Sequence, residues 1–275
     1  MLHFVQSSAT ASRSIIDVSW FDLAWTFGLI LIAVYIARWQ GLGLAQRLVI
    51  GAARTVVQLV LVGYVLVYIF ALDRWYLVVA ALLGMLIVAT KAAVNRQHGT
   101  SRKLLMITSV AMLVASGFTL LYISTLVVHV APWYNPQYLI PLFGMIVGST
   151  MNAATIAAER LASEVTAHQA EIEAYLALGA TYQQASQQPV RQALRASLIP
   201  TVNGLMVVGI VTLPGMMTGQ ILAGSSPLIA IRYQIVVVFM QAAAVAITTA
   251  MVTLWYRRTF FTPALQLKLQ TNAAA

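Results

Sequence analysis

The uncharged polar side chains within the long apolar runs of this sequence are amides and hydroxyls, which can hydrogen-bond a solute but are not the groups that usually relay protons. Gln58 lies about 15 Å into one run at 1.5 Å per residue, and Asn152 and Asn203 lie in two others. Proton-coupled carriers usually place carboxylates or His inside the membrane. None of the 7 Asp and Glu or 4 His lies near the middle of a run. Gln58, Asn152 and Asn203 are candidates for a translocation path; the alternative is interhelical hydrogen bonding worth about 0.6 kcal/mol each.

The segment 213–219, Leu-Pro-Gly-Met-Met-Thr-Gly, is the second place with distinctive chemistry. Pro214 removes a backbone donor and Gly215 loosens the next position, so the pair predicts a kink or break. A break leaves carbonyls that need a partner, water or solute, although a kinked helix can also serve packing alone. Met216 and Met217 are soft metal ligands or adaptable packing residues. Without a neighbouring His or Cys, packing is favoured, and metal ligands stay unknown. We add Pro214, Gly215, Met216 and Met217 to the candidate path.

Composition decides where such residues can lie. The chain has 275 residues, of which 60% are hydrophobic and 8% charged, whereas soluble domains carry about 25% charged residues. Its mean hydropathy is +0.84. These values exclude a soluble enzyme, because so few charges cannot cover a water-exposed surface. The net charge of +9 sits between apolar runs, so it indicates membrane topology and no nucleic-acid partner. The absence of Cys excludes disulfides, thiolate metal sites and Cys nucleophiles.

Seven apolar runs approach the roughly 20 residues that a membrane-spanning helix needs. They predict an all-α fold, a polytopic membrane helix bundle with about seven transmembrane helices. We expect a polar N-terminal arm over 1–19, a single transmembrane domain over 20–260 with a cytoplasmic region at 159–197, and a C-terminal tail over 261–275. The predicted spans cover residues 20–37, 48–72, 75–94, 104–128, 138–158, 198–223 and 228–256.

The distribution of Lys and Arg predicts the orientation of these spans. Only Arg13, Arg74 and Arg232 fall on one side, and the rest of the 16 Lys and Arg residues fall on the other. The positive-inside rule therefore predicts the N-terminus outside and the C-terminus in the cytoplasm. The asymmetry also supports the number of spans, because adding or removing one would scramble it.

The polar stretch between the fifth and sixth spans has helical periodicity. Leu161, Val165, Ile172 and Leu176 form one apolar stripe, so the fifth span is expected to continue into the cytoplasm as an amphipathic helix. Gly179 suits a left-handed cap at its end. Thr181 is then expected to cap a second short helix, with Gln184 at the capping-box position, and Pro189 suits the first turn of a third.

This turn between helices is unusually apolar for a cytoplasmic segment. We interpret it as a docking surface for a partner protein, and the alternative is a solvated linker. The apolar residues in question are Ala174, Tyr175, Leu176, Ala177, Leu178, Ala180 and Tyr182.

Several segments resemble a known family. Residues 173–181, followed by 197–201, resemble the cytoplasmic coupling loop of ABC-transporter permeases, although Tyr175 replaces an Ala of that pattern. More specific are segments that resemble the FetB-type iron-export permeases, a family that also includes plant permeases linked to aluminium tolerance. These segments are 58–66, 140–148, 211–219 and 231–235, and the resemblance covers roughly residues 40–260.

The resemblance implies the membrane subunit of an ABC exporter, present as a homodimer in the cell (inner or plasma) membrane and working with a separate ATPase subunit. ATP and Mg²⁺ would then bind the partner, and we expect no cofactor in this chain. The chain lacks the G-x-x-x-x-G-K-[ST] loop that cradles ATP phosphates, so we expect no enzyme activity of its own. The implied ATPase-coupling residues are Glu173, Ala174, Leu176, Leu178, Gly179, Ala180 and Thr181.

Two other functions are compatible with a polytopic membrane protein: an ion-coupled secondary transporter, and a non-transporting scaffold or receptor. The cytoplasmic docking segment favours the ABC permease over the secondary transporter. The predicted break with its polar neighbours favours either transporter over the scaffold. Iron export would suggest His or carboxylate ligands in the path, and the sequence places none there. The expected substrate is therefore iron-like or metal-related, carried as a chelate, or a different solute.

Overall fold

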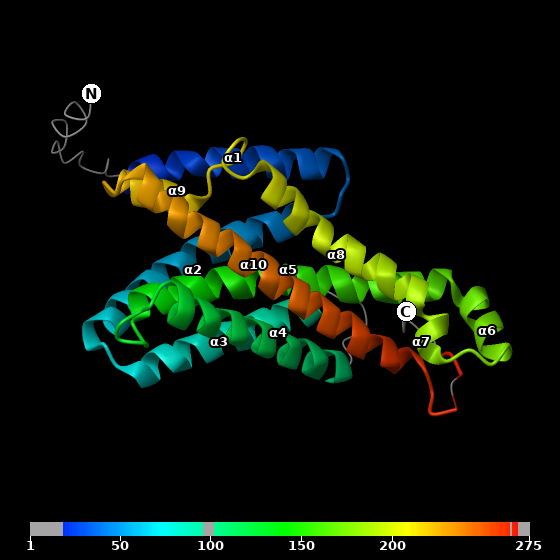
Figure 1. Cartoon of the computed structure of the whole chain (residues 1–275). Helices are drawn as coiled ribbons and strands as arrows, with labels where there is room; N and C mark the ends of the chain where they lie inside the picture. Colours follow the sequence, from blue (N-terminus) through cyan, green and yellow to red (C-terminus); the bar gives the residue numbers. More distant parts are fainter. Residues whose placement is uncertain (1–18, 96–101, 265, 269–275) are drawn as a thin grey trace, which may run out of the picture. The chain divides into compact units, whose positions relative to one another are not determined.

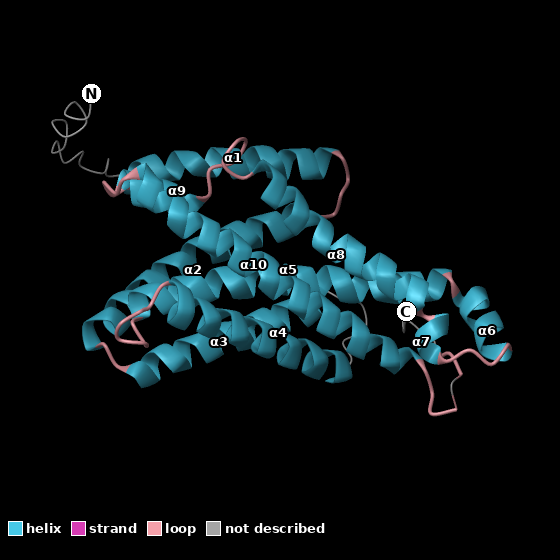
Figure 2. Cartoon of the chain, viewed as in Figure 1, coloured by secondary structure: helices cyan, strands magenta, loops and turns pink. Residues whose placement is uncertain are grey.

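The structure is a computed structural model that describes residues 19–95, 102–264 and 266–268. The predicted N-terminal arm, apart from Ser19, lies outside the described residues, as do most of the predicted tail and the basic residues Arg13 and Arg96. Within the described ranges the chain consists of helices joined by short connections (Figure 2), and its only β-type pairings are two isolated bridges.

Six of the described helices are long and apolar enough to cross a membrane. They match six of the seven predicted spans, so the all-α, multi-pass fold is confirmed. A short π-helix, η1 (Ile123–Val127), continues α4. The six helices are α1 (Trp20–Trp39), α2 (Ala45–Leu72), α3 (Trp75–Asn95), α4 (Arg102–Tyr122), α5 (Pro136–Ala167) and α10 (Pro227–Tyr256).

The predicted sixth span is broken into two helices. α8 (Gln187–Val207) joins the predicted third cytoplasmic helix to the first part of this span, and it runs through Pro200. A non-helical segment, residues 208–214, separates it from α9 (Gly215–Leu222). The break is confirmed, but it begins at Val208, six residues before Pro214. The number of membrane crossings and their orientation stay predictions.

Contacts divide the chain into two compact units, which are described separately. The first unit contains α1 and α2 together with residues 219–226. Its α1 begins with a capping box, in which the Asp22 amide donates to the Ser19 hydroxyl at 3.2 Å and Asp22 accepts from the Ser19 amide. Gly41 and Gly43, both with positive φ, allow the chain to reverse so that α1 packs against α2.

The second unit, residues 74–218 and 227–275, is built around α5 (Figure 1). α5 packs against α3, α4, α8 and α10. It presents a run of buried small residues, Ala153, Ala154, Ala157 and Ala158, which lets neighbouring helices approach closely. A hydrophobic cluster joins this helix to the ends of α3, α4, α8 and α10 and to Ile172 and Ala185 beyond the spans.

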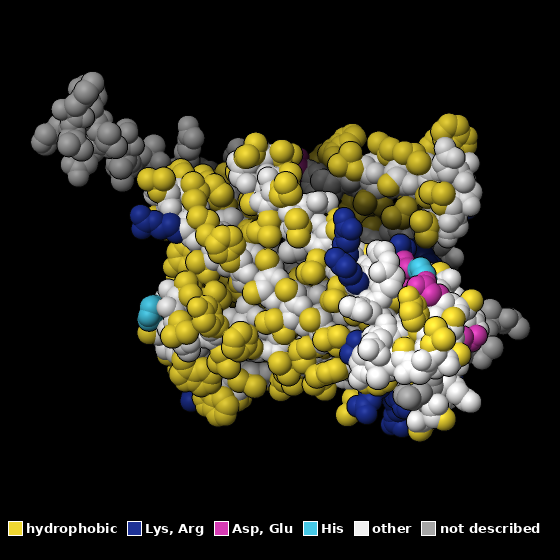
Figure 3. All heavy atoms as spheres, turned by 45° about the vertical axis from the view of Figure 1, so that its right-hand side comes forward, with side chains coloured by type: hydrophobic (Ala, Val, Ile, Leu, Met, Phe, Trp, Pro, Cys, Tyr) yellow, Lys and Arg dark blue, Asp and Glu magenta, His cyan; other side chains and the backbone are white. Residues whose placement is uncertain are grey.

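The outer surface of the long helices is apolar, as a bilayer requires. Large apolar side chains such as Val88, Phe118 and Phe239 are exposed on α3, α4 and α10, and yellow side chains cover much of the surface in Figure 3. Acidic side chains gather instead at the end of the second unit formed by α6 (Gln169–Ala177) and α7 (Tyr182–Ala185). The long helices of this unit therefore have the surface of membrane spans, and the α6–α7 end has the surface of a water-exposed region.

Candidate functional site

A polar cavity of about 350 Å³ lies between α5, α8 and α10 in the second unit. Each of these helices and the broken segment contribute hydrogen-bonding side chains to its wall. They are Ser149 and Asn152 from α5, Ser197 and Thr201 from α8, Thr212 from the broken segment, and Gln234 and Gln241 from α10. Such a lining can hydrogen-bond a solute from several directions.

Gln234 is the most constrained of these side chains. It is 7% exposed, and within the described part of the chain its Oε1 is buried without a hydrogen-bond partner. Leaving a buried acceptor unsatisfied costs about 1–3 kcal/mol. Ser197, in contrast, donates its hydroxyl hydrogen bond to the Ala193 carbonyl oxygen at 2.9 Å, within its own helix. Gln234 therefore places an amide with an unsatisfied oxygen, among the described residues, at the wall of the cavity.

The broken segment forms part of the same wall through Val208, Thr212 and Pro214. Gly209 adopts a left-handed conformation with φ of +84° and donates to the Thr212 carbonyl oxygen at 2.9 Å. Within the described ranges, the carbonyls of residues 209–211 accept no backbone hydrogen bond. Non-helical backbone at membrane depth is tolerated only where protein covers it or where it lines a water-filled cavity. Val208, Thr212 and Pro214 of this segment thus belong to the cavity wall, whereas Ile210 and Val211 are exposed and line neither cavity.

The structure brings only some of the predicted path residues together. Asn152 and Pro214 line the polar cavity, and Pro214 and Met217 line an adjoining apolar cavity of about 290 Å³. Asn203 is exposed on α8 and lines neither cavity. Gln58 is exposed on α2, in the first unit. Gly215 begins α9, and the half-buried Met216 lines neither cavity. A transport role for these residues stays a prediction.

Gln234, Gln241 and Thr201 are cavity residues that the candidate path omitted. The two glutamines carry a signal in the sequence, because their spacing of seven residues places them on one face of a helix, two turns apart. That spacing identifies a polar stripe in the last span. The sequence does not show which neighbouring helices the stripe faces.

Beyond the spans, α6 and α7 form a turn that we call the elbow, residues 168–186. The predicted amphipathic helix is interrupted at His168, where α5 has ended at Ala167 and α6 begins at Gln169. His168 Nδ1 lies 3.0 Å from the Glu164 carbonyl oxygen and 3.4 Å from Glu164 Oε2. The apolar stripe continues across the interruption, because Leu161, Val165 and Ile172 are all at most 1% exposed.

The turn at Gly179 is held by a Schellman motif. Gly179, with φ of +85°, donates to the Leu176 carbonyl oxygen at 3.0 Å, and Ala180 donates to that of Tyr175 at 3.0 Å. Thr181 and Gln184 then form a capping box at the start of α7. The predicted left-handed cap and capping box are confirmed. Backbone groups that the two helix ends would leave free are therefore satisfied locally.

The outer end of the elbow is apolar and exposed. Leu178 is 85% exposed and Tyr175 47% exposed, and Ala174 and Ala177 are exposed beside them. We call these four residues the elbow tip. Leu176 and Ala180 are half-buried behind it, and Glu173 accepts a hydrogen bond from Gln169 Nε2 at 2.9 Å. This geometry presents a small apolar knob on a well-fixed base.

The described residues contain no group of three or more His, Asp or Glu side chains that could hold a metal ion. The polar cavity offers only amide, hydroxyl and backbone groups. Its chemistry suits hydrogen bonding to a solute or to the ligands of a complexed metal.

Comparisons with known proteins agree with this architecture. Residues 20–261 match the family described as "Uncharacterised protein family (UPF0014)". The chain is 43% identical to the UPF0014 membrane protein slr1647 of Synechocystis, over 93% of this chain and 98% of that protein. It is 36% identical to the Probable iron export permease protein FetB of Escherichia coli, over 90% and 93%, respectively.

The plant Protein ALUMINUM SENSITIVE 3 of Arabidopsis thaliana is 34% identical over 87% of this chain and 86% of its own length. No solved structure matches the chain significantly. The similarity extends over nearly the whole length of these relatives, and the resemblance seen in the sequence is confirmed. The chain is a multi-pass membrane protein and belongs to the UPF0014 family.

Proposed function

We propose that this chain is the permease subunit of an ABC transporter, a homodimer in the cell membrane that exports a metal-related solute when a separate subunit hydrolyses ATP. Two findings support the general class. The chain is a multi-pass membrane protein, and one relative of nearly equal length is named a probable iron export permease.

The observation that carries the proposal is the elbow tip. A solvated linker would expose polar side chains alone, whereas this turn also exposes the large apolar Leu178 and Tyr175. Behind the tip, Ile172 and Ala185 belong to the same buried cluster as residues of α5, α8 and α10. Force applied to the tip by a partner would reach three helices of the second unit.

Each proposed coupling residue has a distinct place in this arrangement. Ala174 and Leu178 of the tip would enter an apolar groove of the ATPase, and Leu176 and Ala180 would seat the tip on its base. Gly179 and Thr181 would fix the direction of the turn. Glu173, held by Gln169, would present a carboxylate beside the groove.

The polar cavity is the proposed solute site. Asn152, Gln234 and Gln241 would offer hydrogen bonds, Pro214 would shape the wall where the helix is broken, and Met217 would line the adjoining apolar cavity. The described cavity wall has no carboxylate or His, so a metal would travel as a complex whose ligands, rather than the bare ion, are recognised. ATP and Mg²⁺ belong to the partner in this proposal.

The decisive variant is Leu178→Asp, because the side chain is exposed and its replacement should not disturb folding. Burying a Leu in an interface contributes about 1.5–3 kcal/mol, so ATPase activity that co-purifies with the tagged full chain should fall at least about tenfold. The matched control is Gln187→Asp, an exposed position at the start of α8 outside the tip, which should retain the activity.

A second measurement tests the transport step. Inside-out vesicles containing the chain and its co-purifying ATPase would be given iron as a citrate complex or as the free ion, with and without ATP. ATP-dependent accumulation should be seen with the complex and should be lost with Leu178→Asp. Full partner association in that variant, or accumulation without ATP, would refute the ABC assignment.

A further inference from the structure

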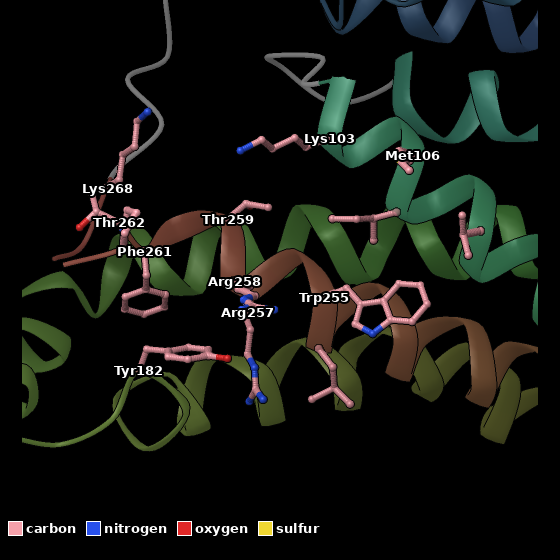
Figure 4. Close-up of a pocket in the computed structure, with 14 residues that line it drawn as sticks. Lys103, Met106, Tyr182, Trp255, Arg257, Arg258, Thr259, Phe261, Thr262 and Lys268 are labelled. Carbon is pink, nitrogen blue, oxygen red and sulfur yellow. The ribbon is translucent and has the colours of Figure 1, made fainter. Parts of the chain in front are cut away.

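A second and larger cavity of about 940 Å³ lies at the end of the second unit (Figure 4). Its wall is assembled from the start of α4, the start of α7, the end of α10, the short 3₁₀ helix η2 (Arg257–Phe260) and the segment that follows it. Four lining side chains are cations: Lys103, Arg257, Arg258 and Lys268. The described lining includes no Asp or Glu.

Two of these cations are placed by specific contacts. The Arg257 guanidinium carbon lies 5.8 Å from the centroid of the Tyr182 ring, and that ring packs on Phe261 with centroids 5.5 Å apart. Lys268 is drawn back toward η2 because its amide donates to the Phe260 carbonyl oxygen at 2.7 Å. The C-terminal segment thereby places a cation in a cavity that also includes Tyr182 and residues of α4, which are far away in the sequence.

The positive charge of this cavity lacks a counter-charge within the part of the chain that the structure describes. The Arg160–Glu164 ion pair and the His168–Glu164 contact found there involve none of the four cations. Arg257 Nε is buried and has no hydrogen-bond partner among the described residues. Lys103, the second residue of α4, adds its charge where the helix dipole is already positive. A bound anion would balance the charge of the four cations that line the cavity.

The remaining wall is apolar and belongs to helices that can span the membrane. Met106 on α4 is 69% exposed, and Leu254 and Trp255 near the end of α10 are 42% and 43% exposed. In Figure 4, Arg257 and Arg258 lie between Tyr182 on one side and Trp255 on the other. The cavity thus combines a cationic region with an apolar surface that continues along α4 and α10.

We infer that this cavity binds the phosphate-bearing headgroup of an anionic phospholipid. The phosphate would take charge-assisted hydrogen bonds from Arg257, Arg258 and the two lysines. The acyl chains would lie along Met106, Leu254 and Trp255. Basic pockets between membrane helices are a known setting for anionic headgroups. A free phosphate ester shares the phosphate chemistry but has nothing to place on the apolar wall, so the lipid fits both halves of the site.

Tyr182 gives the site a connection to the elbow, because this residue is the first of α7 and its ring lies against Arg257 and Phe261. A bound lipid would therefore contact the elbow, α4, α10 and the C-terminal segment together. The inference concerns binding and does not depend on the proposed transport function.

The test uses the full chain in detergent and measures lipid retention by native mass spectrometry, with thermal unfolding as a second readout. The probes are dioleoyl phosphatidylglycerol, dioleoyl phosphatidylcholine and glycerol 3-phosphate. Phosphatidylglycerol should be retained at least about tenfold better than the zwitterionic lipid, since each basic residue near a headgroup contributes about 1 kcal/mol. It should also raise the unfolding temperature, whereas glycerol 3-phosphate should have little effect.

The first variant is Lys103→Gln with Lys268→Gln, two exposed positions whose replacement should leave the fold intact. It should weaken phosphatidylglycerol retention by about fivefold for each cation removed. Arg258→Gln, also exposed, repeats the test at a third position. The control is Arg195→Gln, an exposed cation on α8 that does not line the cavity, and it should bind as the unchanged chain does.

Three outcomes would overturn the inference. Equal retention of both lipids would show that the phosphate charge is not recognised. An equal loss with Arg195→Gln would indicate general attraction to a basic surface. Glycerol 3-phosphate binding as well as phosphatidylglycerol would identify a soluble phosphate ester as the ligand and refute the lipid assignment.

Discussion

The helix interruptions at Gly179 and Gly209, both in the second unit, share a local conformation but differ in what surrounds it. Gly179 and Gly209 both adopt left-handed geometry, with φ of +85° and +84°, and a Cβ added at either would meet no atom within 4 Å. Around Gly179 a Schellman motif and a capping box satisfy the helix ends. Around Gly209 the carbonyls of residues 209–211 accept no backbone hydrogen bond in the described ranges. The backbone groups at the Gly179 turn are therefore hydrogen-bonded locally, whereas the Gly209 turn has carbonyl groups without a backbone partner among the described residues.

The elbow and the broken segment, residues 208–214, also differ in how deeply their side chains are buried. The elbow is anchored by Ile172 and Ala185, which are 1% and 4% exposed. In the broken segment Ile210 and Val211 are 88% and 74% exposed. Segments with few buried contacts open at the lowest free-energy cost. We therefore expect the elbow to move as part of the core, and residues 208–214 to change conformation more readily.

The largest effect on stability should come from removing the anchor of the elbow. Ile172→Ala deletes a fully buried side chain and should lower the free energy of unfolding by about 2–5 kcal/mol, measured by denaturant unfolding in detergent. Val211→Ala removes an exposed side chain from the broken segment and should cost less than about 1 kcal/mol. Similar losses of unfolding free energy in the two variants would show that the elbow is not anchored more firmly than the broken segment.

The second largest effect on the free energy of unfolding is expected at Gln234, where a substitution should not destabilise the protein. Gln234→Leu removes a buried oxygen that has no partner among the described residues, so the unfolding free energy should stay level or rise by about 1–3 kcal/mol. Solute transport should fall in the vesicle assay, because the cavity loses a hydrogen-bonding group.

Ser197→Ala is the control for Gln234→Leu. Its hydroxyl is satisfied within α8, so transport should be retained. A loss of stability in Gln234→Leu would show that the amide is structurally required, contrary to the view of this cavity as a site with free capacity.

The smallest expected losses of stability come from substitutions at the two left-handed glycines, and these variants compare the two turns directly. Gly179→Ala and Gly209→Ala each place a Cβ in left-handed geometry and should each cost about 1–2 kcal/mol. The two variants should differ in which function they lose, because Gly179→Ala alters the proposed docking turn and Gly209→Ala alters the segment beside the cavity. We expect Gly179→Ala to reduce ATPase co-purification and Gly209→Ala to reduce transport with the ATPase still bound. Identical functional losses would argue against two distinct roles.

The sequence predicts most of the helices because their signals are local. Span length, the apolar stripe through Leu161, Val165 and Ile172, and the Gly179 and Thr181 caps each depend on a few neighbouring residues. Pro214 correctly indicated a broken span. It misplaced the start of the break, because the left-handed Gly209 and the hydrogen bonds to the Val207 carbonyl already end α8 before the chain reaches the proline.

The cavity was harder to predict because it depends on which faces of three helices meet. Asn152 was chosen for its depth in a span, and it does line the cavity, whereas Asn203 satisfies the same criterion and is exposed. Gln234 and Gln241 lie on the helix that faces α5 and α8, and only the packing of these helices makes them cavity residues. Depth along a helix can be read from sequence, but the direction in which a side chain faces depends on distant partners.

α8 has a mechanical consequence of its own, because one helix extends from the elbow to the cavity. Its 21 residues, Gln187 to Val207, amount to a rod about 30 Å long at 1.5 Å per residue. Tilting such a rod by about 10° around its elbow end would displace its far end by about 5 Å. Pro200 lies within the rod and on the cavity wall, where its missing amide weakens the helix. In the proposed transporter α8 would therefore act as a lever arm, with its internal proline at the wall of the cavity that its swing would reshape.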